Sequence, residues 1–332
     1  MTIVATPPAP VTAPVEPEED DVPIVINRAG TRVDKAFRFA LASSSMVVLL
    51  ILVGVVVFLA ANGWKALAVG GIHFITDDTW SPDSGHFGAG PLLLGSIAIA
   101  VVAVVIAGPI SLAAALMINE YAPIWARGFL TGVVDCLATV PSIVYGFWGL
   151  ALISNLQAAP AQWLVAHFGF VPFIRTPSPG QFGDSIFACG LVCSVTLIPI
   201  ITSISREVMS QTPREACEGA LGLGGTRWGM VTDVIFPFSR NGIVGAFLLG
   251  FGRGLGETMI VVLILSQRNI YTWGIMGPNG LGSIAKQITE DFTTGTALDK
   301  SALILLGLVL FLITLLVNLV ARTIVNRGGS SK

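Results

Sequence analysis

Residues 206–240 read REVMSQTPREACEGALGLGGTRWGMVTDVIFPFSR and form a polar segment between two strongly apolar stretches. Within it, Glu218–Ala220 is followed after three residues by Gly224, and after nine more by Val234–Pro237. The flanking stretches are each long enough to cross a bilayer, which takes about 20 apolar residues. The segment is therefore predicted to be a structured loop between two membrane spans.

The local chemistry of this loop predicts two short helices joined at a glycine corner. Thr212 followed by Pro213 is typical of a helix start, and Gly222 and Gly224 are typical of a helix end. Thr226 is placed to cap a second short helix. Such a compact protrusion suits the groove of another protein, in the manner of helix-in-groove recognition.

The composition identifies an integral membrane protein. The chain has 332 residues, of which 53% are hydrophobic and 11% charged, with a mean hydropathy of +0.80. Soluble domains average about 25% charged residues. The net charge of −2 by itself says nothing about nucleic acid, but the sequence has no basic tail or patch, and no nucleic-acid partner is expected. The proline-rich, acidic residues 1–34 are expected to be a disordered tail, and residues 327–332 a second short tail.

Six segments are long and apolar enough to span a membrane, which predicts an all-α membrane protein with six transmembrane helices. Val140-Pro141 is expected to bend the third, because proline removes a backbone donor. The expected spans are Phe37–Ala61, Leu92–Met117, Phe129–Ile153, Ser185–Ser205, Gly242–Ser266 and Ser301–Val325.

The distribution of Lys and Arg predicts the orientation. Most of these residues flank the termini or lie in the loops on the same side as residues 206–240. The positive-inside bias therefore places both termini and this loop in the cytoplasm. The four cysteines come without the His or Cys pairs of a metal site, and we expect them to be reduced and to bind no metal.

Two ionisable residues lie inside the fifth predicted span. Arg253 and Glu257 are four residues apart, so a continuous helix would place them on one face. A charge inside a bilayer is costly and usually faces a protein interior or a water-filled path. The planar guanidinium suits an oxyanion, whereas a structural ion pair that fixes helix packing explains the two residues equally well.

The spacing of the polar loop resembles the coupling loop of binding-protein-dependent ABC importer permeases, with Gly219 in place of an alanine and Phe236 in place of a leucine. The segments Val140–Gly149 and Gly252–Thr258 further resemble the signatures of phosphate-specific Pst permeases. The ending of Val140–Gly149, like Trp80–Pro82, is more similar to the PstC type than to the PstA type.

This resemblance implies the fold of a type I ABC importer permease, a MetI-like bundle with cytoplasmic coupling helices. It implies a first helix with an outer loop over residues 35–90 and a permease core over residues 91–326. The chain would be a multi-pass, non-catalytic subunit of a bacterial plasma membrane importer, forming half of the path for inorganic phosphate.

The resemblance also implies partners and site residues. The partners would be a PstA-like permease, a dimer of PstB-like ATPases and a PstS-like phosphate-binding protein. The chain has no Gly-x-x-x-x-Gly-Lys pattern, so ATP and Mg would be held by the ATPase. The residues expected along the substrate path are Arg253, Glu257, Thr258, Tyr145 and Ser142. The residues expected to couple to the ATPase are Glu218, Gly219, Ala220, Gly224, Arg227 and Pro237.

Other interpretations remain open from the sequence. Ser142 and Tyr145 could contact an anion or instead satisfy backbone groups freed by Pro141. Asp135 is expected to pair with a neighbouring arginine. The loop spacing fits importers of sulfate, molybdate or amino acids equally well. An ion-coupled secondary transporter, with Arg253 and Glu257 as a relay, would leave the loop unexplained.

Overall fold

The structure is a computed structural model that describes most of the chain from Arg32 to Gly329. The chain divides into two units, Met1–Gly54 and Val55–Lys332. Most of the expected N-terminal tail lies outside the described residues, and the expected C-terminal tail is described only to Gly329, as part of a helix. The described residues are 32–81, 85–156, 158–171, 173–174, 184–266, 268–272, 274–277 and 280–329.

The described residues are mainly helical, as the apolar composition predicts, because a helix satisfies its backbone hydrogen bonds within one segment. The longer α-helices are α1 Arg32–Gly70, α3 Gly90–Leu116, α4 Ile124–Thr139, α5 Ser142–Leu156, α6 Ala158–Phe168, α7 Ile186–Ser210, α8 Arg214–Gly222, α10 Phe236–Leu255, α12 Ile284–Asp291 and α13 Ala297–Gly329. The shorter elements are α2 His73–Thr76, α9 Arg227–Met230, α11 Met259–Ile264, the π-helices η2 Met117–Tyr121 and η3 Val231–Ile235, and the strands β1 Trp80–Ser81 and β2 His86–Phe87.

Five helical segments are long and apolar enough to cross a membrane, and a sixth span results if the bent pair α4 and α5 is counted as one. The predicted six spans are reached when this pair is counted as one, and the pair is bent by 87° at the expected proline. Pro141 has no backbone N–H to give to the carbonyl four residues earlier, that of Leu137. The Tyr145 hydroxyl donates to this Leu137 oxygen at 2.9 Å.

The prediction of one continuous fifth span over Gly242–Ser266 is wrong. Helix α10 ends at Leu255 and α11 begins at Met259, so the span is broken inside its apolar stretch. At its other end α10 continues from α9 through η3, and this helical segment runs unbroken from Arg227 to Leu255. The π-turns of η3 immediately precede Pro237, which cannot donate to the preceding turn.

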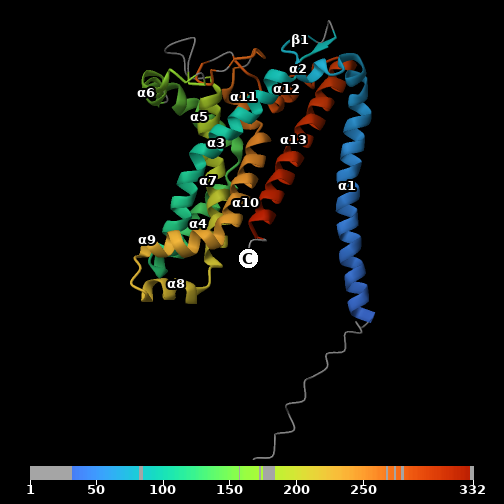
Figure 1. Ribbon diagram of the computed structural model, residues 1–332. Coiled ribbons are helices and arrows are strands. Elements are labelled where there is room, and N and C mark those ends of the chain that lie inside the picture. Colours follow the sequence, from blue (N-terminus) through green and yellow to red (C-terminus); the bar gives the residue numbers. More distant parts are fainter. Residues whose placement is uncertain are drawn as a thin grey trace, which may run out of the picture. The chain divides into compact units, whose positions relative to one another are not determined.

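The centre of the Val55–Lys332 unit is the packing of α3 against α7, with α10 alongside both (Figure 1). Small residues permit this approach. A Cβ atom at Gly190 would lie 2.5 Å from Val102 Cγ1, and one at Gly254 would lie 3.4 Å from the Ala100 backbone. Helix α8 lies at one end of this unit, and α6, α12 and the β1–β2 hairpin lie at the opposite end (Figure 1).

We expect Gly190→Leu to destabilise the protein by about 1–3 kcal/mol, because the added side chain overpacks the α3–α7 contact. Gly245→Leu is the matched control, since a Cβ atom at Gly245 has no neighbour within 4 Å. Thermal unfolding in detergent should show a lower midpoint for Gly190→Leu alone. Equal midpoints for the two variants would contradict the packing described here.

Candidate functional site

The break between α10 and α11 is the structural feature on which the predicted substrate residues converge. Helix α10 stops at Leu255, and the Gly256 N–H donates to the Arg253 carbonyl at 3.2 Å. The Glu257 N–H bonds the Gly254 carbonyl at 3.3 Å in the same turn. The Thr258 hydroxyl donates to the Gly256 carbonyl at 3.3 Å. Side chain and backbone thus both hold the polar turn in place.

The expectation that Arg253 and Glu257 share one helix face is wrong, because the helix ends two residues before Glu257. Arg253 is exposed, whereas Glu257 is only 8% exposed. Within the described parts of the chain no ion pair joins the two residues. The turn at Gly256 therefore separates a solvent-accessible guanidinium from a buried carboxyl group.

Arg253 opens onto a hollow between three of the membrane-spanning helices. Its volume is about 480 Å³, and its lining residues come from α7, α10 and α13. These residues are Ile200, Leu249, Gly252, Arg253, Thr314 and Asn318. A charged side chain in an otherwise apolar span is typical of a residue that faces a water-filled path or a protein partner.

Ser142 and Tyr145 do not line the hollow beside Arg253. Tyr145 uses its hydroxyl on Leu137, so it satisfies the backbone group freed by Pro141. Its helix, α5, instead packs against α11, and a Cβ atom at Gly146 would lie 2.7 Å from Leu263 Cδ1. The structure therefore places these residues beside the helix that follows Glu257 and Thr258, and not beside Arg253.

Asp135 has a different partner from the one expected. The Ser203 hydroxyl of α7 donates to the Asp135 carboxylate at 3.2 Å, and among the described residues no arginine pairs with it. The contact joins α4 to α7 through a neutral donor. A serine is short enough to be accommodated between two closely packed helices.

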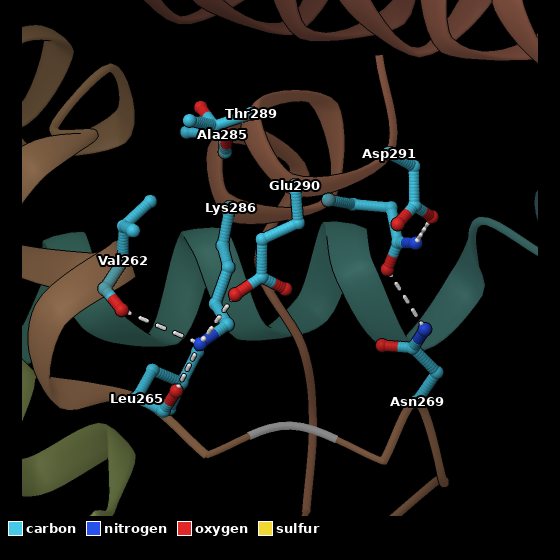
Figure 2. Close-up of polar contacts among 9 residues, drawn as sticks. Val262, Leu265, Asn269, Ala285, Lys286, Thr289, Glu290 and Asp291 are labelled. Carbon is cyan, nitrogen blue, oxygen red and sulfur yellow. Dashed lines mark hydrogen bonds and ion pairs between the residues drawn. The ribbon is translucent and has the colours of Figure 1, made fainter. Parts of the chain in front are cut away.

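The far end of α11 is held by Lys286, which the sequence analysis missed. Figure 2 shows its ammonium group directed at the carbonyls of Leu265 and Val262, at 2.6 and 3.4 Å, and at Glu290, at 3.1 Å. These are the carbonyls that the end of α11 leaves without helical partners. Lys286 is only 9% exposed, so its three N–H donors are directed at partners inside the protein.

The helix that carries Lys286 is itself anchored to α3. Ser96 of α3 accepts a hydrogen bond from the Ile284 N–H at 3.0 Å and donates to the Leu92 carbonyl at 2.9 Å. On the same helix, the Gln287 carboxamide donates to the Asp291 carboxylate and accepts from the Asn269 carboxamide at 3.0 Å. The amphipathic pattern of residues 284–291 predicts a short helix, but it places Lys286 away from the apolar Ile284 and Ile288, so the pattern carries no signal for this clamp.

The second candidate site is the protrusion formed by α8 and α9, which confirms the predicted pair of short helices. The end of α8 has the geometry of a Schellman motif. The Gly225 N–H donates to the Ala220 carbonyl at 3.1 Å, and the Gly224 N–H to the Leu221 carbonyl at 3.0 Å. Gly224 has φ of +88°, a conformation that disfavours other residues.

The N-terminal caps of these helices were predicted with mixed success. Thr226 caps α9 as expected, with its hydroxyl accepting from the Gly229 N–H at 3.0 Å. Thr212 does not cap α8, because the cap position is Pro213 and the buried Thr212 hydroxyl has no hydrogen-bond partner among the described residues. The loop therefore relies on its C-terminal glycine motif more than on an N-cap.

One face of the protrusion packs on the protein and the other is exposed. Cys217 and Ala220 pack against a buried cluster that includes Met230 and Ile235. Burial, with the nearby carboxylates of Glu120 and Glu218, raises the pKa of Cys217, so the neutral thiol is favoured. The exposed residues of α8, α9 and the corner between them include Arg214, Glu215, Glu218, Gly219, Leu221, Leu223, Arg227 and Trp228. Leu223 is 93% exposed, which is unusual for a leucine at a structured corner.

Known proteins resemble this chain over most of its length. The family described as "Binding-protein-dependent transport system inner membrane component" matches residues 107–327. The chain is 34% identical to the phosphate transport system permease protein PstC of Haemophilus influenzae, over 91% of this chain and 96% of that protein. It is 32% identical to PstC 2 of Mycobacterium tuberculosis, over 90% of this chain and 93% of that protein.

A solved structure supports the same architecture. A chain of the MetNI methionine ABC transporter in an inward-facing conformation superimposes with a TM-score of 0.52, covering 71% of this chain and 94% of that chain. At 14% sequence identity this likeness concerns the fold alone. The predicted fold class, an all-α type I importer permease, is confirmed.

We expect Gly224→Ala to loosen α8, since a residue with a Cβ atom pays about 1 kcal/mol or more in the left-handed region. Gly219→Ala should instead stabilise α8 by up to about 1 kcal/mol, because alanine favours a helix and its Cβ atom meets no neighbour within 4 Å. Hydrogen–deuterium exchange of residues 214–222 should become faster in the first variant and slower in the second. The reverse order would contradict the corner geometry.

We expect Lys286→Met to lower stability by about 1–3 kcal/mol, because it leaves buried carbonyls without a donor. Glu290→Gln should cost less, since Glu290 is partly exposed and the carbonyl contacts of Lys286 remain. Thermal unfolding in detergent, with the exposed Lys65→Met as a control, compares the variants. Equal losses in Lys286→Met and Glu290→Gln would assign the stabilisation to the ion pair instead.

Proposed function

We propose that this chain forms half of the path of an ATP-driven importer for inorganic phosphate. The premise is that the chain belongs to the family of binding-protein-dependent transport system inner membrane components. The observation that carries the proposal is the exposed Arg253 in a hollow between membrane-spanning helices. Guanidinium donors match the geometry of phosphate oxygens, and one positive charge attracts an anion into an otherwise apolar region.

Release of the anion requires that the attraction be limited. A lone cation in a low dielectric could hold phosphate too tightly for transport. Glu257 lies four residues along the chain, behind the turn at Gly256, and makes no direct ion pair with Arg253 in the described structure. We propose that its carboxylate moderates the field at Arg253 from this buried position, and that Thr258, Tyr145 and Ser142 support the turn and the neighbouring helix.

The exposed protrusion supports the proposed ATPase partner. Glu218 and Arg227 give the surface around Gly219 its charge, and the exposed Leu223 and Trp228 give it apolar area. A groove on another protein would cover such a surface. Arg227 begins the helical segment that reaches Leu255, and Pro237 lies within it. We propose that a PstB-like ATPase dimer, which holds ATP and Mg, moves this surface, while this chain itself binds no cofactor.

The remaining partners follow from the same proposal. A PstA-like permease would complete the path, and a PstS-like protein would deliver phosphate from outside. We propose a multi-pass chain in the bacterial plasma membrane, with both termini and the protrusion in the cytoplasm, as the Lys and Arg distribution favours. Rocking of the two permeases would then expose Arg253 alternately to each side.

Phosphate uptake into proteoliposomes tests the proposal. The vesicles would contain this chain with its partner permease, ATPase and binding protein, with or without enclosed ATP. We expect ATP-dependent uptake that excess sulfate does not compete away. The assembled complex could instead hydrolyse ATP and take up another oxyanion or an amino acid. That result would be consistent with the importer architecture but would refute phosphate as the substrate.

We expect Arg253→Ala to abolish uptake while the complex still assembles, because Arg253 is the one charged residue among the described residues that line the hollow. Arg253→Lys should retain partial uptake, since an ammonium attracts the anion without the bidentate fork. Arg268→Ala, at an exposed position outside the hollow, is the control. Uptake at the wild-type rate by Arg253→Ala would contradict the proposed role.

A further inference from the structure

Helix α13 carries three polar side chains within its apolar span, and packing between helices explains only one of them. Its span, Ala297–Val320, contains the most apolar 18-residue window of the spanning helices in the described chain, with a mean hydropathy of 3.0. Between Ser301 and Val320, the polar side chains are Ser301, Thr314 and Asn318. A polar group exposed to hydrocarbon costs several kcal/mol. Each of the three therefore calls for a partner.

Ser301 has a structural partner. Its hydroxyl donates to the Asn62 carbonyl at 2.6 Å and accepts from the Ala66 N–H at 3.3 Å, which joins α13 to α1. The two helices also approach closely here, because a Cβ atom at Gly63 would lie 3.2 Å from Leu305. Packing between helices accounts for this serine.

Thr314 and Asn318 have no such explanation. The Thr314 hydroxyl donates to the Phe311 carbonyl at 2.8 Å, which leaves its oxygen free to accept. Asn318 is exposed and forms no hydrogen bond with the described residues. The two are four residues apart on one helix face. Both line the hollow into which Arg253 of α10 opens.

We propose that Thr314 and Asn318 bind the transported oxyanion on the side of the hollow opposite α10, so that the anion lies between them and Arg253. The inference rests on the proposed function. The Asn318 carboxamide offers two N–H donors and one carbonyl acceptor, and Thr314 offers an acceptor. A hydrogen phosphate presents both unprotonated oxygens and a P–OH group, so this set of donors and acceptors matches it.

Neutral side chains suit a site through which an ion must pass. Conduction requires binding that is favourable enough for entry and weak enough for exit. A second positive charge opposite Arg253 would bind the anion more tightly and slow its release. An amide and a hydroxyl instead orient the anion without adding charge. They also replace part of the hydration that the anion loses in an apolar span.

The test uses the full reconstituted importer and two substitutions that keep side-chain size. Asn318→Leu removes the amide, and Thr314→Val removes the hydroxyl. Thr323→Val is the matched control, because the Thr323 hydroxyl makes the same kind of bond, to Val320 at 2.7 Å, outside the hollow. The readouts are the maximal rate of phosphate uptake, ATP hydrolysis stimulated by the binding protein, and copurification of the partner subunits.

We expect Asn318→Leu to lower the maximal uptake rate at least about tenfold, the size expected for losing hydrogen bonds to a charged group. Thr314→Val should lower it less, and Thr323→Val should not change it. Stimulated ATP hydrolysis should persist in all three, because substrate contact is lost while coupling to the ATPase is not. A merely structural role would reduce hydrolysis and uptake together.

Three outcomes would overturn the inference. Uptake by Asn318→Leu at the wild-type rate would show that the amide does not contact the anion. Loss of the partner permease from the Asn318→Leu complex would assign the residue to assembly. If Thr314→Val and Thr323→Val changed the uptake rate equally, a position lining the hollow would have no special effect on uptake. Failure of the wild-type importer to take up phosphate would instead refute the proposed function.

Discussion

The structure depends on one constraint: inside a bilayer, every backbone polar group must find a partner within the protein. In the described residues two of the apolar spanning segments are interrupted, and each interruption leaves carbonyl groups without helical partners. Tyr145 supplies the donor at the first break, where Pro141 has none to give. Lys286 supplies donors at the end of α11, which follows the second break. At the second break itself, the Gly256 and Glu257 N–H groups and the Thr258 hydroxyl bond the carbonyls of the turn.

Because hydrogen bonds fix the geometry of these breaks, the breaks can position charge. The turn at Gly256 leaves Arg253 open to a hollow and carries Glu257 into the protein. A continuous helix would have paired the two residues and neutralised the site. The interruption of the helix therefore keeps the guanidinium available for an anion, and the apolar walls of the hollow strengthen its field.

The protrusion and the hollow are linked by one helical segment. It begins at Arg227, next to the glycine corner, and continues through a π-helical turn to Leu255. At 1.5 Å per residue, Arg227 and Arg253 are roughly 40 Å apart along it. In the proposed importer, a displacement of the protrusion would reach the substrate path through this segment, whose packing against α3 and α7 limits bending.

The sequence by itself determined the membrane class, the number of spans, the bend at Pro141 and the two short helices of the loop. These features follow from hydropathy and from the backbone limits of proline and glycine, which act locally. Only the tertiary structure decided that the fifth predicted span breaks before Glu257, that Lys286 holds α11, and that Asn318 lies beside Arg253 in one hollow. These depend on contacts between residues far apart in the chain, and a hydropathy pattern carries no information about which helix faces meet.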